Sequence, residues 1–219
     1  MIIPTYEQAK QYEKDYTYIP VCREILADDV TPILMLRKLA ALDGQYFLLE
    51  SVEGGNLGRY SFLGYHPKLS VSCKNGVVKV KENGMVRILP GKPKEALQSL
   101  LEQYRSPQIE GLPTFTGGLV GYFAYETIQY AEPKLHIKQS DVNDFELMMF
   151  DKLLAFDQVM HKLCIIVNAR TTDGEAGYNK AVEEIDAFIE TLRITEPIPY
   201  EKPQKAPEFT CNLSKEEYC

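Results

Sequence analysis

The sequence predicts an α+β fold in which helices pack against antiparallel sheets. Three short runs between residues 69 and 89 alternate polar and apolar side chains and are separated by Asn-Gly pairs, which is typical of an antiparallel meander. Segments with helical periodicity lie before and after this meander. Strands occur in groups with helices between them, rather than in regular strand-helix alternation, and this favours α+β over a parallel α/β sheet.

Composition narrows the possible functions. The 219 residues are 45% hydrophobic, enough to bury a large core, and the formal net charge is −7 with no basic run, so we expect no nucleic-acid partner. No run of about 18 apolar residues occurs, and the first 16 residues carry scattered charges, so we expect a cytoplasmic protein without a membrane partner. The five cysteines have no C-x-x-C spacing and the three histidines are dispersed, so we expect no metal site in this chain.

The first strong helix signal covers residues 31–44. Thr31 suits the N-cap, Pro32 suits the first helical position, and Gly44 suits a left-handed residue after the last turn. An apolar strand, QYFLLESV, follows at 45–52.

The meander comprises strands at 69–74, 77–82 and 85–89, joined by tight turns at the two Asn-Gly pairs. The alternation of polar and apolar residues predicts that one face of the sheet is exposed to solvent. A helix follows in 92–104, with one apolar face. We predict that this face consists of Ala96, Leu97, Leu100, Leu101 and Tyr104.

The stretch TFTGGLVGYFAY (114–125) reads as a strand with internal glycines. Such glycines allow close approach of either a neighbouring backbone or a ligand, and both readings stay open. Neither this stretch nor GGNLGR (54–59) has the Lys-Ser/Thr ending of a phosphate-binding loop.

Two apolar strands, 147–158 and 162–170, precede a long helix at 175–192. Its predicted buried face is Tyr178, Ala181, Val182, Ile185, Ile189 and Leu192. We assign residues 1–194 to one domain and the proline-containing segment 195–208 to a linker. Ser214 and Glu217 have the spacing of a capping box, so residues 209–219 are expected to begin a further domain of a longer protein; a frayed tail is the alternative.

The stretch 48–64, LLESVEGGNLGRYSFLG, combines Glu50, Ser51, Arg59, Tyr60 and Ser61 around a glycine-rich turn. An anion, hydroxyls, a cation and apolar walls are what a free amino acid requires. The alternative is that these residues only form a turn and bind no ligand, with Arg59 paired to Glu50 or Glu53.

Five segments together resemble the N-terminal half of the anthranilate synthase large-subunit family. They are 19–39, 47–67, 117–133, 147–157 and 209–219, and they span nearly the whole chain. The most specific is 47–67, in which an LLES strand end precedes RYSFLG.

This resemblance implies a feedback site for L-tryptophan that includes Ser51, Glu50 and Leu49. Arg59, Tyr60 and Ser61 match the same motif and are expected to support the loop. Gln129 and Cys211 depart from the family, which often has arginine and serine there; the first could alter an ion pair near the glycine-rich strand.

The resemblance also implies that catalysis lies elsewhere. Chorismate, Mg²⁺ and the catalytic residues are expected in a C-terminal chorismate-binding domain after Cys219, so this chain has no catalytic residue and should be inactive alone. The complete lyase would convert chorismate to anthranilate and pyruvate, with ammonia from a glutamine amidotransferase subunit.

Two alternatives stay open. The first is the aminodeoxychorismate synthase large subunit of folate synthesis, which holds tryptophan permanently. The second is a purely structural or subunit-docking domain, in which Ser51 is only a turn residue.

Overall fold

The computed structural model describes residues 2–50, 58–132, 134, 135, 137, 141–200, 211 and 214–218. The strands are β1 (Ile2–Ile3), β2 (Tyr18–Leu26), β3 (Tyr46–Leu49), β4 (Tyr60–Tyr65), β5 (Leu69–Lys74), β6 (Val77–Glu82), β7 (Met85–Leu89), β8 (Gly118–Phe123), β9 (Phe145–Phe150), β10 (Lys152–Asp157) and β11 (Lys162–Arg170). The α-helices are α1 (Tyr6–Ala9), α2 (Pro32–Leu42), α3 (Pro93–Glu102), α4 (Gly174–Ile194) and α5 (Lys215–Tyr218), with 3₁₀ turns η1 (Lys10–Tyr12), η3 (Tyr125–Tyr130) and η4 (Thr171–Asp173).

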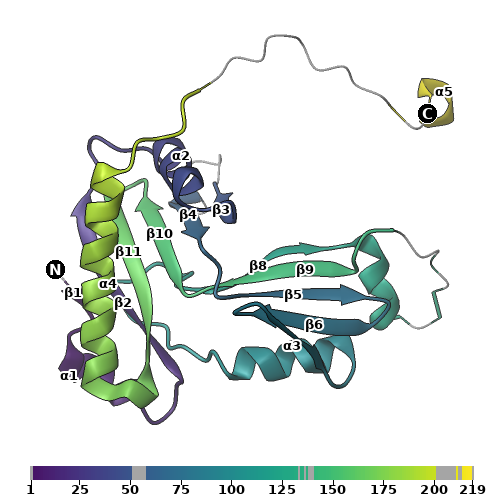
Figure 1. The fold of residues 1–219 in the computed structure, drawn as a ribbon, viewed down its shortest axis with the longest axis horizontal. Helices are drawn as coiled ribbons and strands as arrows, with labels where there is room; N and C mark the ends of the chain where they lie inside the picture. Colours follow the sequence, from purple (N-terminus) through teal and green to yellow (C-terminus); the bar gives the residue numbers. More distant parts are fainter. Residues whose placement is uncertain are drawn as a thin grey trace.

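These strands form two sheets, and every pairing is antiparallel, which confirms the predicted α+β class. The six-stranded sheet has the order β1-β2-β11-β10-β4-β3, and the five-stranded sheet has the order β7-β6-β5-β9-β8. Figure 1 shows α4 lying along the six-stranded sheet and α3 beside the five-stranded one. None of the described helices is long and apolar enough to cross a membrane.

The chain crosses between the sheets at two neighbouring points. One crossing joins β4 to β5, and the other joins β9 to β10 at Asp151. The prediction of one strand at 147–158 is therefore wrong, because its two halves pair in different sheets. Hydrogen bonds link the two crossings. Lys68 Nζ donates to the Asp151 carboxylate at 3.2 Å, and the backbone N–H of Asn168 donates to the Asp151 carbonyl at 2.9 Å.

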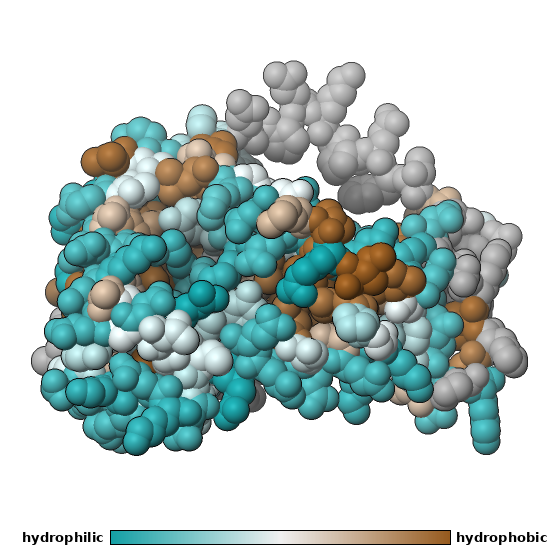
Figure 2. All heavy atoms as spheres, turned by 60° about the horizontal axis from the view of Figure 1, so that its bottom comes forward, coloured by the Kyte–Doolittle hydropathy of each residue, from teal (hydrophilic) through white to brown (hydrophobic). Residues whose placement is uncertain are grey.

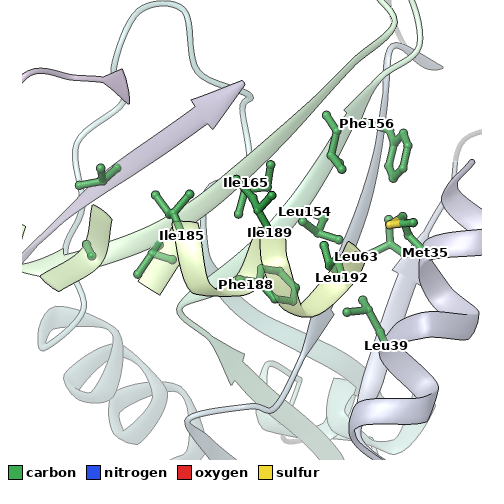
Figure 3. Close-up of a cluster of buried hydrophobic side chains, with 14 of the residues drawn as sticks. Met35, Leu39, Leu63, Leu154, Phe156, Ile165, Ile185, Phe188, Ile189 and Leu192 are labelled. Carbon is green, nitrogen blue, oxygen red and sulfur yellow. The ribbon is translucent and has the colours of Figure 1, made fainter. Parts of the chain in front are cut away.

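The main core lies between the six-stranded sheet and helices α2 and α4, as Figure 3 shows. Ile185, Ile189 and Leu192 of α4 are buried there, together with Leu154 and Ile165 of the sheet. The predicted face of α4 is confirmed. The prediction omitted Phe188, which is also buried and stacks on Tyr65 with ring centroids 4.8 Å apart.

Helix α2 begins as predicted but ends differently. The Thr31 hydroxyl accepts from the Leu34 amide at 3.2 Å, and Pro32 is the first helical residue. Gly44 is not in the left-handed region, so that prediction is wrong. Instead Asp43 is extended, and its carboxylate caps the turn by accepting from the Gln45 amide at 2.8 Å.

The meander is confirmed at β5, β6 and β7. Asn75-Gly76 and Asn83-Gly84 all have φ between 48° and 79°, as a two-residue turn of type I′ requires. Helix α3 covers one face of this sheet with buried Ala96 and Leu100. Leu101, on the predicted apolar face, is 45% exposed.

The C-terminal segments are described only in part. Helix α4 ends at Ile194, and Ile198 beyond it exchanges hydrogen bonds with Arg37. Residues 201–208 of the predicted linker lie outside the described residues. Helix α5 begins at Lys215, directly after Ser214. The three-part division of the chain stays a prediction.

Candidate functional site

The candidate ligand site lies where edge strand β3 ends. β3 pairs with β4 up to Leu49, which lies opposite Phe62. Leu49 is 48% exposed although it is apolar, and Glu50 after it is also exposed. Ser51, the central residue of the sequence hypothesis, falls outside the described residues, as does Glu53. The described part of the site therefore offers an exposed apolar side chain and an exposed carboxylate.

Arg59 stands just before β4, at the same end of the sheet, and is held by Asp157. Its Nη2 lies 2.6 Å from Asp157 Oδ2, and its Nε lies 3.1 Å from both carboxylate oxygens. Asp157 ends β10 and is 6% exposed, while the Arg59 side chain keeps 41% exposure. The acid partner of Arg59 is thus Asp157, and not the Glu50 or Glu53 that the sequence suggested.

Asp157 also fixes the turn that leads into β11. Its Oδ1 accepts from the amides of Val159 and Met160 at 3.1 and 3.0 Å. Burial by itself raises the pKa of the Asp157 carboxyl, but the hydrogen bonds from Arg59 and from these two amides outweigh burial, so the pKa lies below its usual value. Asp157 is therefore an ionised anchor that sets the position of Arg59.

Tyr60 and Ser61 begin β4 and have different surroundings. The Arg59 guanidinium carbon lies 4.9 Å from the centre of the Tyr60 ring, within cation–π range. Burial first, and then the nearby Asp157 charge, raise the pKa of the Tyr60 hydroxyl. The Ser61 side chain is fully buried, and its hydroxyl accepts from Gln158 Nε2 at 2.8 Å. Ser61 is therefore positioned as a support inside the sheet, and Tyr60 as part of its surface.

Sequence reasoning missed Asp157 and Gln158, which organise this end of the sheet. Both follow the buried run LLAF, where a strand leaves the core. Polar residues at that point signal a strand end, but nothing in the sequence shows that β10 lies beside β4. The antiparallel register, with Asp157 opposite Tyr60, brings them together.

The glycine-rich strand β8 is explained by sheet packing. A Cβ atom at Gly121 would overlap the carbonyl oxygen of Glu146 on β9, and one at Gly117 would lie 2.8 Å from Asn168 Nδ2. Gly117 and Gly118 have φ of 155° and 143°, in the region that favours glycine. Of the two readings of this stretch, close approach of a neighbouring backbone fits Gly121.

Metal-ligating side chains are not gathered anywhere in the described ranges: no group of three or more His, Cys, Asp or Glu residues could hold an ion there. Cys22, Cys73 and Cys164 are buried free thiols, and Cys211 is an exposed one. The expected Mg²⁺ and catalytic residues stay predictions.

Comparison with known proteins gives a consistent result at the level of sequence. No protein-family model matches the chain. The chain is 33% identical over its whole length to "Anthranilate synthase component 1" of Acetivibrio thermocellus, covering 47% of that protein. It is 35% identical over 93% of its length to the protein of the same name from Acinetobacter calcoaceticus, covering 42% of it. The chain thus spans less than half the length of these curated relatives.

The solved structures agree on the fold. The crystal structure of anthranilate synthase component I from Streptococcus pneumoniae TIGR4 matches 88% of this chain and 42% of its own, with a TM-score of 0.58 and 23% identity. That likeness supports the fold alone. Over its whole length the chain is similar in sequence to anthranilate synthase component 1 proteins, and it matches less than half of each of these two relatives.

Proposed function

We propose that this chain is the N-terminal, feedback-regulatory portion of an anthranilate synthase component 1 and binds L-tryptophan at the end of β3. The single observation that carries the proposal is the LLES-to-RYS stretch in a chain similar to these proteins. Its described part presents exposed Leu49 and Glu50 beside the Arg59–Asp157 pair. Ser51, Glu50 and Leu49 are the proposed ligand-binding residues.

The chemistry of these groups suits a zwitterionic amino acid. The Glu50 carboxylate can accept from an ammonium group, and the Ser51 hydroxyl can donate to a carboxylate. Leu49 supplies apolar surface for an indole ring. Arg59 uses Nε and Nη2 for Asp157, so its role is to hold the start of β4 in place, with Tyr60 and Ser61.

In the complete protein, we propose, tryptophan lowers the affinity for chorismate, and chorismate lowers the affinity for tryptophan by the same factor. The complete enzyme would convert chorismate to anthranilate and pyruvate with ammonia from a glutamine amidotransferase subunit. Mg²⁺ and the catalytic residues would belong to its C-terminal chorismate-binding domain, which makes this chain inactive by itself.

The test uses the absence of tryptophan from the sequence. Indole fluorescence in a mixture of this chain and L-tryptophan comes only from the ligand, so its anisotropy reports binding directly. We expect saturable binding that Ser51→Ala abolishes and that Ser99→Ala, at an exposed serine of α3, leaves unchanged.

The same titration separates the alternatives. Tryptophan that survives extensive dialysis would indicate a permanently held ligand, as in aminodeoxychorismate synthase. Absence of binding both in this chain and in the full-length subunit would support a purely structural domain. Binding that appears only in the full-length subunit would mean that the C-terminal half completes the pocket.

A further inference from the structure

Strand β7 forms an outer edge of the five-stranded sheet and carries an unusual number of exposed apolar side chains. Met85 is 74% exposed, Val86 62% and Ile88 65%. Figure 2 shows brown, hydrophobic side chains gathered into a patch on the part of the surface formed by this sheet. Native proteins usually protect such edges with charges, bulges or covering segments, so an exposed apolar edge strand calls for a partner.

The register of β7 shows which backbone groups face outward. The two-residue turn at Asn83-Gly84 makes Glu82 and Met85 a hydrogen-bonded pair, and such pairs alternate along an antiparallel ladder. Arg87 therefore bonds to Val80, while the N–H and C=O groups of Val86 and Ile88 point away from β6. No backbone hydrogen bond from another described segment reaches these two residues.

Most of the charged side chains around this edge are cationic. Val86 and Ile88 lie on the face opposite α3, directly across from Lys81 and Lys79 of β6. A cleft of about 560 Å³ on this open face is lined in part by Lys79, Lys81 and Val86. Arg87 points to the other side of the edge. The β6–β7 hairpin thus carries three cations and one acid, Glu82, in a chain whose net charge is −7.

We propose that β7 is a docking edge for an extended segment of another polypeptide in which apolar and acidic residues alternate. The segment would add as a further strand, exchanging main-chain hydrogen bonds with Val86 and Ile88. Its apolar side chains would lie beside Val86 and Ile88 on the open face, and an acidic side chain would lie beside Arg87. Complementary charge at Arg87 selects acidic residues on that side of the occupant, whereas Val86 and Ile88 select apolar residues on the open face.

A second copy of this chain fits the edge less well. The two-fold register that uses both outward residues pairs Val86 with Ile88 and places Arg87 directly opposite Arg87. Like charges in directly opposed positions destabilise a strand pair. A partner of different sequence avoids this repulsion.

The test uses two labelled peptides as probes, acetyl-Glu-Val-Glu-Ile-Glu-Val-Glu-amide and its counterpart with lysine in place of glutamate. Fluorescence anisotropy measures their binding to the full chain, and size-exclusion chromatography with light scattering measures its oligomeric state. We expect saturable binding of the acidic peptide only, with slower hydrogen exchange at the amides of Val86 and Ile88. The chain itself should stay monomeric.

Two variants probe the edge by different means. Ile88→Pro removes an outward N–H that the β6–β7 ladder does not use, so the sheet should persist. Arg87→Glu keeps the backbone and reverses the charge. Each should weaken binding of the acidic peptide at least about tenfold, and Arg87→Glu should also confer binding of the basic peptide. The matched charge control is Lys180→Glu, at an exposed lysine of α4.

Several outcomes would overturn the proposal. They are no binding of either peptide, equal binding of both, or binding that neither edge variant alters. A concentration-dependent dimer that Ile88→Pro abolishes would also overturn it, because the edge would then serve a second copy of the chain.

Discussion

The six-stranded and five-stranded sheets are both antiparallel, yet their strands are buried differently. Five of the six residues of β10 are buried, as are residues 163–167 of β11. Strand β5 instead alternates buried and half-buried residues, and β6 alternates buried and exposed ones. Helices α2 and α4 cover one face of the six-stranded sheet, while a smaller cluster that includes Ala155, Cys164 and Ile166 forms on its other face. Helix α3 covers only one face of the five-stranded sheet.

This difference shows that the sequence pattern of a strand depends on how many of its faces are covered. A strand buried on both faces reads as a continuous apolar run, and a strand with one wet face alternates. Edge strand β7 presents its exposed Val86 and Ile88 on the open face of the five-stranded sheet. The molecule therefore combines a core that stabilises it with a surface that is free to bind.

Truncating one isoleucine beside each sheet tests whether the difference in burial is reflected in the free energy of unfolding. Ile185 is fully buried against the six-stranded sheet, so Ile185→Ala should lower the free energy of unfolding by about 3–4 kcal/mol. Ile88 on the open face is 65% exposed, and Ile88→Ala should change it by less than about 1 kcal/mol. Urea denaturation measures both; equal losses would contradict the difference in burial.

A second experiment tests the packing of β8 on β9. Gly121→Ala should lower the free energy of unfolding by about 2 kcal/mol, because its Cβ meets the backbone of Glu146 and Leu147. Gly44→Ala is the control, since nothing lies within 4 Å of a Cβ there and its backbone is not left-handed. Thermal unfolding followed by circular dichroism should show a lower midpoint for the first variant only. If both midpoints stayed unchanged, the close approach at Gly121 would be refuted.

The Arg59–Asp157 pair gives the six-stranded sheet a pH dependence. Because the pKa of Asp157 is lower in the folded protein than in the unfolded one, its contribution is present above about pH 4 and is lost as the pH falls through the folded pKa. Asp157→Asn should lower the free energy of unfolding by about 1–2 kcal/mol at neutral pH and flatten its fall towards low pH.

Urea midpoints measured between pH 7 and pH 3 check this expectation. Asp28→Asn, at an exposed aspartate before α2, should keep the wild-type pH profile. A pH profile of Asp157→Asn that matched the wild type would show that the pair contributes nothing.

The smallest expected effect concerns the hydrogen bond between Tyr130 and Asp144, beside the five-stranded sheet. Tyr130 donates to the buried carboxylate of Asp144 at 2.5 Å, and Asp144 also accepts from the Gly76 amide at 3.2 Å. Tyr130→Phe should lower the free energy of unfolding by about 1 kcal/mol. Tyr125→Phe, at a ring that is 78% exposed, should have no measurable effect in the same urea denaturation. Equal values for the two variants would rule out a stabilising role for the Tyr130 hydrogen bond.

Much of the local structure could be predicted from the sequence. The Asn-Gly turns specify their own backbone conformation, so the meander follows from residues adjacent in the chain. The buried face of α4 follows from helical periodicity for the same reason. For the candidate site, the sequence supplies the chemistry of Glu50, Arg59 and Tyr60, and the position of Leu49 and Glu50 at the end of a strand is confirmed.

Tertiary structure decided the rest, because the missing information concerns residues far apart in the chain. The run LMMFDKLLAFD has no period that reveals a change of sheet at Asp151, since both halves are apolar. Arg59 meets Asp157 only because β4 pairs with β10, across a separation of 98 residues. Local periodicity and turn chemistry were enough to predict the meander and helices α2 and α4. Strand order, the partner of Arg59 and the exposed edge at β7 required the pairing of distant strands, which local preferences do not encode.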